Sequence, residues 1–219
     1  MKAMKAYKGF PMEGPIAAWY TRITLKDLKR HTLMARQLVS KIPAHGSVLE
    51  IAPGPGYFCL ELARQGQFHI TGLDISRSFV AIASKNAERA GIAVDFQAGN
   101  ASDMPFGDGT FDFTFCQAAF KNFTEPVKAI SEMYRVLKPN GVAVMADMRR
   151  DASREDMERE VQGMGLGGFN RAVTLWTFTH MLVKSAYSVS DVESMVAQTP
   201  FAKCRIEAEG VGFQAWMEK

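Results

Sequence analysis

The fold is decided by the run Val48-Leu49-Glu50-Ile51-Ala52-Pro53-Gly54-Pro55-Gly56-Tyr57. Its first residues are mostly apolar and β-prone, as in a buried strand, and the glycines and prolines after them indicate a tight turn. Glycine lets a backbone approach a ligand closely, and a helix that begins after the turn presents free N–H groups. We therefore expect a nucleotide-like ligand at this turn, on the carboxyl edge of a sheet.

On either side of this run, the chain from Ser47 onward alternates short apolar segments with segments of helical period. This alternation predicts a parallel sheet covered by helices on both faces. Proline cannot continue a helix and Asn-Gly readily adopts left-handed backbone, so Pro139-Asn140-Gly141 predicts the end of the helix before the fifth strand. The expected strands are residues 48–52, 69–74, 94–98, 111–116 and 142–147, and the expected helices are 57–65, 76–90 and 126–137.

The 219 residues suffice for one α/β domain with a buried sheet, so we expect a single domain. Within it, residues 1–46 predict a helical leader or cap and residues 47–147 the ligand-binding core. Residues 148–188 predict a lid insertion, and residues 189–219 a helix followed by a hairpin of two strands. Ser190 is the expected N-cap of that last helix, with Glu193 completing a capping box.

Composition and charge limit the kinds of partner that the sequence supports. The chain has 26 basic and 23 acidic residues, scattered along its length, which gives no support to a nucleic-acid partner. No stretch reaches the roughly 20 apolar residues that span a bilayer, so no membrane insertion is expected. Cys59, Cys116 and Cys204 have neither CxxC nor metal-ligand spacing, which predicts no metal site and a reducing compartment, the cytoplasm.

The glycine-rich turn does not match the dinucleotide fingerprint. Counting from Gly54 and Gly56, the third glycine of that fingerprint falls at Cys59. Glu50, at the end of the first strand, would repel a pyrophosphate but could hold a ligand that carries an ammonium group. Both observations disfavour a nicotinamide dinucleotide.

With these residues the chain resembles the class I S-adenosyl-L-methionine-dependent methyltransferases, over roughly residues 47–147. The resemblance is to the small-molecule branch that includes the ubiquinone and menaquinone biosynthesis methyltransferases. Ala52 stands where that family usually has its first glycine, which costs little if the backbone there stays in an ordinary region. The resemblance implies S-adenosyl-L-methionine as cofactor and a Rossmann-like, doubly wound sheet of seven mostly parallel strands ending in a C-terminal antiparallel hairpin.

The resemblance also assigns site residues. Asp74 closes the second strand, where an acid accepts hydrogen bonds from both ribose hydroxyls; the alternative for Asp74 is a plain helix N-cap. Asn100-Ala101 stands where relatives usually have Asp-Ala, next to the adenine. The spacing from Pro105-Phe106 to Phe111-Asp112 is the most family-specific feature. The cofactor-binding residues implied are Glu50, Ala52, Gly54, Gly56, Asp74, Ile75, Asn100, Ala101, Cys116 and Gln117.

The acceptor side of the site is less determined. Methyl transfer from a sulfonium needs alignment more than a strong acid, and a base only when the acceptor must lose a proton. Many relatives have histidines where Lys121 and Asn122 stand, so a base at that place cannot be carried over. The candidate catalytic residues are His31, Asp147, His180 and Tyr20, each with a structural role as the alternative.

Two apolar features could also border the acceptor. Trp19 and Tyr20 either fold over the cofactor mouth or form an ordinary packed pair. A stripe in the predicted lid is either its inner face, which would favour a partly apolar acceptor, or simple core packing. The stripe consists of Val173, Leu175, Trp176, Phe178, Met181 and Leu182.

The sequence therefore predicts an enzyme that transfers a methyl group to a small-molecule acceptor by in-line displacement. Three alternatives stay open at this point. They are a non-catalytic or accessory protein that keeps the cofactor pocket, a methyltransferase acting on RNA or protein, and, least favoured, a NAD-dependent oxidoreductase. The sequence specifies neither the acceptor and its attacking atom nor the oligomeric state.

Overall fold

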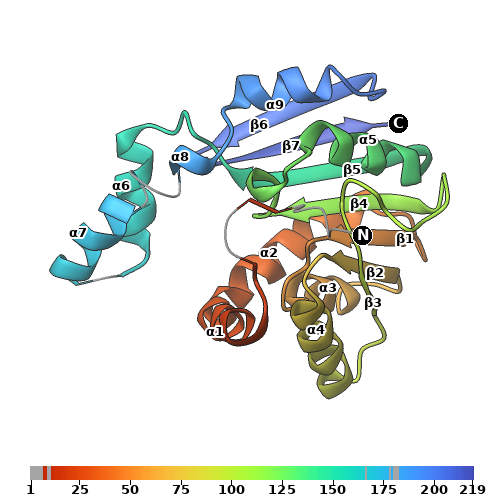
Figure 1. Cartoon of the computed structure of the whole chain (residues 1–219), viewed down its shortest axis with the longest axis horizontal. Helices are drawn as coiled ribbons and strands as arrows, with labels where there is room; N and C mark the ends of the chain where they lie inside the picture. The colour runs from red at the N-terminus through yellow and green to blue at the C-terminus, as the bar shows by residue number, and fades with distance from the viewer. Residues whose placement is uncertain (1–6, 9–10, 166, 178, 180–182) are drawn as a thin grey trace.

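The computed structural model describes residues 7–8, 11–165, 167–177, 179 and 183–219. Within this part of the chain, seven strands form one sheet in the order β3-β2-β1-β4-β5-β7-β6 (Figure 1). Strands β1 to β5 pair in parallel, and β7 is antiparallel to both β5 and β6. The predicted doubly wound sheet with a C-terminal antiparallel hairpin is confirmed. The strands are β1 Ser47–Ile51, β2 His69–Asp74, β3 Asp95–Ala98, β4 Phe111–Gln117, β5 Leu137–Met148, β6 Lys203–Glu209 and β7 Gly212–Glu218.

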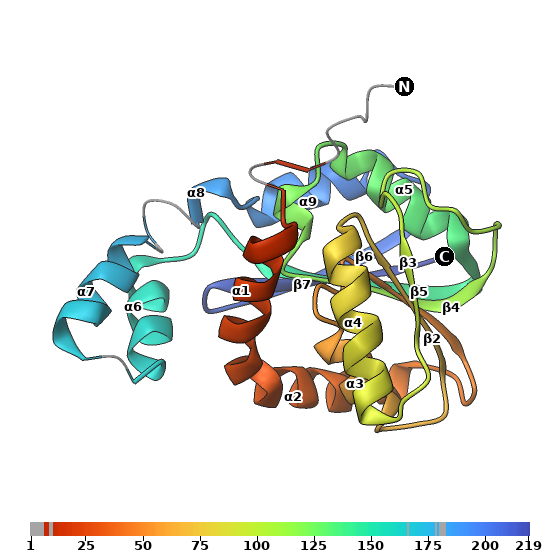
Figure 2. The same cartoon turned by 60° about the horizontal axis from the view of Figure 1, so that its bottom comes forward.

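Helices cover both faces of this sheet (Figures 1 and 2). Successive strand residues point to opposite faces, so Leu49 and Ile51 lie in the core under α5 and α9, and Val48 lies in the core under α2 and α3. Helix α4 packs beside α3 and against β3. The helices are α1 Gly14–Thr24, α2 Leu28–Leu38, α3 Tyr57–Ala63, α4 Arg77–Ala90, α5 Pro126–Val136, α6 Arg154–Gly163, α7 Gly168–Thr177, α8 Val183–Ser185 and α9 Val189–Val196.

Serine caps the N-terminus of both α4 and α9, but only the start of α4 lies where the sequence predicted it. Ser76 caps α4 and accepts a hydrogen bond from the Phe79 N–H, as residues 76–90 predicted. For α9 the prediction of Ser190 as N-cap is wrong by two residues. Ser188 is the N-cap and forms a capping box with Asp191, because an acid three residues later can reach back to the Ser188 N–H.

The turn at residues 139–141 lies inside a strand. Helix α5 ends at Val136 and β5 begins at once, with a register shift against β4 before the two strands pair regularly from Val142. Asn140 has φ +64°, so the left-handed backbone predicted there is confirmed. The prediction failed in treating this turn as the boundary before a strand at residue 142; β5 passes through the turn as a bulge.

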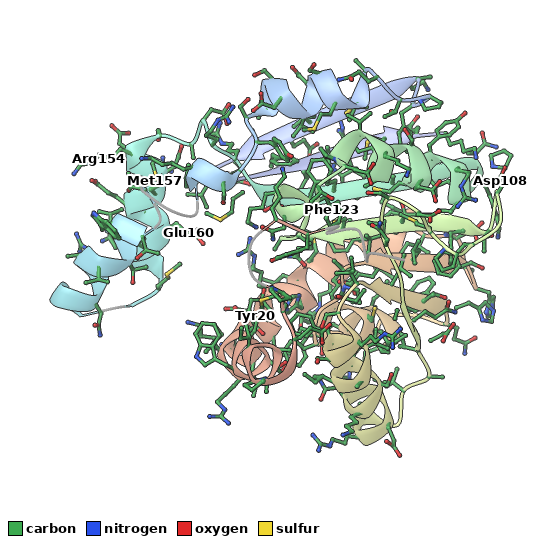
Figure 3. All side chains as sticks on the ribbon, viewed as in Figure 1. Tyr20, Asp108, Phe123, Arg154, Met157 and Glu160 are labelled. Atoms are coloured by element: carbon green, nitrogen blue, oxygen red, sulfur yellow. The ribbon has the colours of Figure 1, made fainter. Side chains whose placement is uncertain are left out.

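The leader forms α1 and α2, and residues 148–188 leave the sheet to form α6, α7 and α8. In both views α6 and α7 lie together to one side of the sheet, and Figure 3 labels Arg154, Met157 and Glu160 on α6. Val173 and Trp176 of the predicted stripe are exposed, and Leu175 packs against a small cluster around Met157. Phe178, His180, Met181 and Leu182 lie outside the described residues.

Strand β6 is the edge of the sheet beyond β7. Its side chains are almost all exposed, and charged residues alternate with small or apolar ones along it. The charged residues are Lys203, Arg205, Glu207 and Glu209. Among the helices that the structure describes, none is long and apolar enough to cross a bilayer.

Candidate functional site

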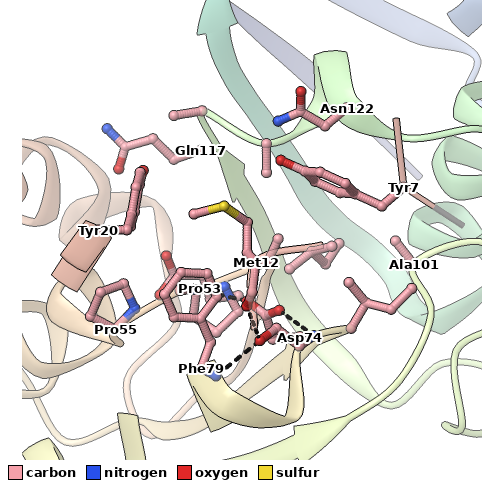
Figure 4. A pocket seen from close by; sticks show the side chains of 18 of the residues that line it. Tyr7, Met12, Tyr20, Pro53, Pro55, Asp74, Phe79, Ala101, Gln117 and Asn122 are labelled. Atoms are coloured by element: carbon pink, nitrogen blue, oxygen red, sulfur yellow. Dashed lines mark hydrogen bonds between the residues drawn. The ribbon is translucent and has the colours of Figure 1, made fainter. Parts of the chain in front are cut away.

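A cavity of about 810 Å³ opens where β1, β2 and β4 reach their carboxyl ends (Figure 4). Eight of the ten predicted cofactor-binding residues line this cavity: Glu50, Ala52, Gly54, Asp74, Ile75, Asn100, Ala101 and Gln117. Gly56 and Cys116 do not line it. Gly56 lies below the turn with φ +78°, where an added Cβ would be 2.8 Å from the Phe96 ring, and Cys116 is fully buried in β4.

Asp74 joins the first two strand ends at the base of the cavity. Its Oδ2 accepts a hydrogen bond from the Gly54 N–H at 3.0 Å, and its Oδ1 accepts one from the Ser76 N–H at 2.8 Å. The carboxyl is buried, which raises its pKa to about 6 despite these two donors. Asp74 therefore points toward the glycine-rich turn, and the helix N-cap is Ser76 instead.

The glycine-rich turn contains a backbone that its sequence does not favour. Ala52 has φ +55°, in the left-handed region, and its N–H donates to the Leu73 carbonyl at 2.7 Å. The condition under which alanine would cost little here, a backbone in an ordinary region, is therefore not met. The hydrogen bond to β2 holds the chain in place, although a Cβ in this region costs roughly 1–2 kcal/mol.

Replacing Ala52 with glycine is expected to stabilise the protein. Glycine removes the Cβ strain but gains entropy in the unfolded chain, so we expect a net gain of roughly 0.5–1 kcal/mol. Thermal unfolding should show a rise in Tm of about 1–4 °C. Ala98→Gly, in the exposed last position of β3, is the control and should lower Tm. A lower Tm for Ala52→Gly would show that the left-handed backbone at Ala52 does not strain the protein.

Glu50 lies at the end of β1 with its carboxyl buried, and its exposed fraction is 4%. The Cys59 thiol donates a hydrogen bond to its Oε2 at 2.8 Å. Burial raises the pKa of Glu50 to about 7, while the hydrogen bonds from Cys59 partly oppose the shift. A buried carboxylate that has only the Cys59 thiol and backbone N–H as donors within the described residues is poorly solvated, and a ligand ammonium group would stabilise its charge.

The ends of β3 and β2 offer a polar and an apolar group, Asn100 and Ile75. The Asn100 carboxamide oxygen accepts from the Ser102 N–H at 3.0 Å, which fixes the side chain in a tight turn. Its amide NH₂ and the second lone pair of its oxygen stay available for a heterocycle. Ile75 lines the cavity although 44% of it is exposed, so a flat apolar ligand would cover it.

The turn after β4 borders the other side of the cavity and is also strained. Ala118 has φ +55°, and its N–H donates to the Ala146 carbonyl at 2.8 Å. The Lys121 ammonium braces this turn, since it donates to the Ala118 carbonyl at 3.0 Å and to Asp147 Oδ1 at 2.9 Å. Lys121 lines the cavity, and Asp147 does not.

The N-terminal strap, residues 7, 8 and 11–14, connects the two rims of the cavity. At one rim, the Glu13 carboxylate accepts from the Arg77 and Ser78 N–H groups at the start of α4, each at 3.0 Å. At the other rim, the Lys8 N–H donates to the Asn122 carbonyl at 2.7 Å, and its ammonium donates to the Tyr187 hydroxyl at 2.6 Å. The sequence analysis missed this strap, because its contacts join residues about 64 to 179 positions apart.

The leader helices add a polar face to the same cavity. The residues that line it from α1, α2 and the turn between them mostly recur at helical spacing: Trp19, Tyr20, Thr24, Asp27, Arg30 and His31. Trp19, Tyr20 and His31 were predicted from the sequence, and the other three were not. Their spacing of three or four residues was the signal that could have found them.

The four candidate catalytic residues lie in different surroundings. Tyr20 and His31 line the cavity, and Tyr20 lies on α1 opposite Phe123 (Figure 3). Burial raises the pKa of Tyr20, so its hydroxyl stays a donor. The Asp147 carboxylate accepts from the Lys121 side chain and from two backbone N–H groups. His180 lies outside the described residues.

Known proteins resemble this chain in sequence. Residues 49–145 match the family described as a methyltransferase domain. The chain is 34% identical to demethylmenaquinone methyltransferase of Deinococcus radiodurans over 107 residues, 48% of this chain and 44% of that protein. It is 36% identical to demethylmenaquinone methyltransferase of Thermus thermophilus over 101 residues, 46% of each chain. The matches thus span less than half the length of these curated relatives.

Two solved structures share the fold over most of the chain. An S-adenosyl-L-methionine-dependent methyltransferase of Aquifex aeolicus matches with a TM-score of 0.65 and 17% identity, over 84% of this chain and 88% of that chain. A Methanococcus maripaludis protein provisionally assigned the same activity matches with a TM-score of 0.77 and 18% identity, over 97% and 95%. Residues 49–145 therefore match a methyltransferase domain on a fold shared with S-adenosyl-L-methionine-dependent methyltransferases, and these matches support S-adenosyl-L-methionine as its cofactor.

Proposed function

We propose that this protein transfers the methyl group of S-adenosyl-L-methionine to a small organic acceptor that enters the same cavity. The observation that carries the proposal is the convergence of Glu50, Asp74 and Gln117, from three strand ends, on one cavity. Bound there, the cofactor supplies a methyl group that its sulfonium already activates. The protein then has to bind, orient and exclude water.

The residues of the cavity fit the chemistry of this cofactor. Asp74 offers acceptors for the ribose hydroxyls, and Asn100 with Ile75 offers a polar edge and an apolar surface for the adenine. Glu50 would take the ammonium group of the methionine part. Arg30 would take its carboxylate, because Lys121 is already paired with Asp147 and Arg30 has no ion-pair partner among the described residues.

The rest of the cavity supports a partly apolar acceptor of low molecular weight. Aromatic rings line it beyond the cofactor residues, with Tyr7 and Tyr20 on opposite sides in Figure 4. Met148 and Ser185, near the two ends of the predicted lid, also line it, which supports a lid role for residues 148–188. The relatives named for demethylmenaquinone favour a small organic acceptor, and the free cysteines Cys59, Cys116 and Cys204 favour a cytoplasmic enzyme.

Isothermal titration with S-adenosylhomocysteine, the demethylated cofactor, tests the first step. We expect saturable binding at one site and no binding of NAD. Release of labelled methyl product from a metabolite pool then separates an enzyme from an accessory protein that only holds the cofactor. Failure of both S-adenosyl-L-methionine and S-adenosylhomocysteine to bind would refute the proposal.

Replacing Arg30 with glutamine tests the assignment of the methionine carboxylate. Because a charge-assisted hydrogen bond is lost, we expect affinity for S-adenosylhomocysteine to fall about 10-fold. Affinity for 5′-methylthioadenosine, which lacks the amino-acid part, should not change. Arg36→Gln, an exposed position on α2 away from the cavity, is the control. An equal loss for both ligands would contradict the assignment.

Glutamine at Glu13 tests the strap. The change removes the charge that binds the start of α4, so the strap should open more often and bound S-adenosylhomocysteine should leave about 5–10-fold faster. Stopped-flow displacement measures this rate. Glu209→Gln, exposed on the distant strand β6, should leave the rate unchanged. An unchanged rate in Glu13→Gln would show that the strap does not control exchange.

A further inference from the structure

His31 is the histidine on the polar face of the leader, and its imidazole borders the cavity from α2. Its ring packs beside Tyr57, with 6.2 Å between ring centroids, immediately after the glycine-rich turn. Gln117, at the end of β4, lies close enough to the ring to affect its pKa. His31 therefore lies at the β1 and β4 end of the cavity, where the methionine part of the cofactor is assigned, and away from Asn100.

Two polar atoms at this place are left unsatisfied. Nδ1 of His31 and Oε1 of Gln117 are buried, and neither has a hydrogen-bond partner within the described part of the chain. Burying such atoms without partners is unfavourable by roughly 1–3 kcal/mol each. Because both residues line the cavity, a bound ligand with polar hydrogens can donate one to His31 Nδ1 and another to Gln117 Oε1.

The surroundings of His31 keep it unprotonated near neutral pH. Burial is the largest cause and lowers its pKa; Asp27 opposes this, Arg30 lowers the pKa further, and Gln117 and Glu61 on α3 raise it, with a lowered pKa as the net result. The other candidates are less suited to accept a proton. Tyr20 has a raised pKa and stays protonated, and the Asp147 carboxylate is paired with Lys121 outside the cavity lining.

Resting on the methyl transfer proposed above, we propose that the acceptor attacks through an O–H or N–H group and that His31 is the base that takes its proton. The acceptor's oxygen or nitrogen forms the new bond to the methyl carbon. The carbon–sulfur bond breaks and its electron pair stays on sulfur. The acceptor's proton passes to the free nitrogen of His31, which later releases it to water. Acceptors without such a proton, such as thioethers and tertiary amines, are excluded.

The first readout is a pH titration of His31 in protein saturated with S-adenosylhomocysteine. The NMR signals of the imidazole ring monitor this titration. His31→Asn identifies the signal among those of the four histidines. We expect a pKa below the usual value of about 6.5, and a lower one still in Asp27→Asn, which removes an opposing charge. A His31 pKa at or above 6.5 would overturn the proposal, since burial at the cavity wall would then not hold the imidazole in its neutral form.

The second readout uses matched probes added to the same loaded protein. Aromatic rings line the cavity, so the probes are catechol and phenethylamine. Each is paired with a fully methylated counterpart that has no proton to give: 1,2-dimethoxybenzene for catechol and the quaternary trimethylammonium compound for phenethylamine. We expect at least one of the protic probes to shift the His31 signal, and neither counterpart to do so. Equal shifts from a probe and its counterpart, or no shift from either protic probe, would overturn the proposal.

Turnover with labelled cofactor completes the test. For a protic acceptor, His31→Asn should lower turnover about 100-fold or more while leaving affinity for S-adenosylhomocysteine within 2-fold. The wild-type rate should fall in acid with the His31 pKa, and the His31→Asn rate should not. Methylation of a thioether or a tertiary amine would refute the assignment. Loss of S-adenosylhomocysteine binding by the wild type would instead refute the proposed function itself.

Discussion

Replacing Asp74 with alanine is expected to weaken binding of S-adenosylhomocysteine by about 100-fold or more. The carboxylate offers acceptors to two ribose hydroxyls, and a hydrogen bond to a charged group contributes roughly 1.5–3 kcal/mol. The same change removes the acceptor for the Gly54 N–H, which positions the glycine-rich turn. Isothermal titration measures the affinity, and thermal unfolding checks that the variant is folded.

A comparison of ligands separates the contact with ribose from damage to the turn. The change should weaken binding of 5′-methylthioadenosine strongly and binding of its 2′-deoxy analogue much less, because the analogue lacks one of the hydroxyls. Asp95→Ala, exposed on β3, is the matched control and should bind both ligands as the wild type does. If Asp74→Ala lowered both affinities equally, Asp74 would act through the turn alone.

The stability of the cofactor-free protein is expected to fall as pH rises from about 4.5 to about 7, because of Glu50. Burial raises the pKa of this carboxyl to about 7 from an ordinary value of 4.5. Between these values the folded protein holds a proton that the unfolded chain has lost, so each rise in pH favours unfolding. The contribution is on the order of 3 kcal/mol once both states are ionised. Asp74, with a pKa raised to about 6, acts in the same direction.

Glutamine at Glu50 isolates this effect, since it keeps an acceptor for the Cys59 thiol but cannot ionise. Urea unfolding should find the variant more stable than the wild type at pH 8, and the difference should shrink at pH 5. Glu88→Gln, exposed on α4, should show no such trend. At pH 8 the variant should bind S-adenosylhomocysteine more weakly and 5′-methylthioadenosine equally well. If the stability difference between the two proteins did not change with pH, the proposed ionisation of the buried Glu50 carboxyl would be contradicted.

The strands of the parallel sheet were accessible to the sequence because each strand carries its own local pattern. Apolar runs ending in Glu50, Asp74 and Gln117 specify buried strands, and the positions of their polar ends specify the edge where a ligand binds. The hairpin around Gly210 was equally local. These features depend on residues within a few positions of one another, which is the range over which periodicity and turn chemistry are informative.

The misjudged features depend on long-range contacts. The left-handed backbone at Ala52 is imposed by the Leu73 carbonyl on the neighbouring strand, and no local pattern reveals it. The cap of α9 differed by two residues because Ser188 and Ser190 are both suitable N-caps, and each has an acid three residues later. The strap could not be predicted, because Glu13 finds its partners only when the fold brings α4 beside it.

The edge strand β6 has a consequence for the behaviour of the protein at high concentration. An open edge offers unpaired N–H and C=O groups to any other strand, and a second molecule could extend the sheet there. Lys203, Arg205, Glu207 and Glu209 give this edge charges of both signs, basic in its first half and acidic in its second. A second copy docking its own β6 in parallel register would place like charges side by side, so pairing of two molecules through this edge is opposed in that orientation.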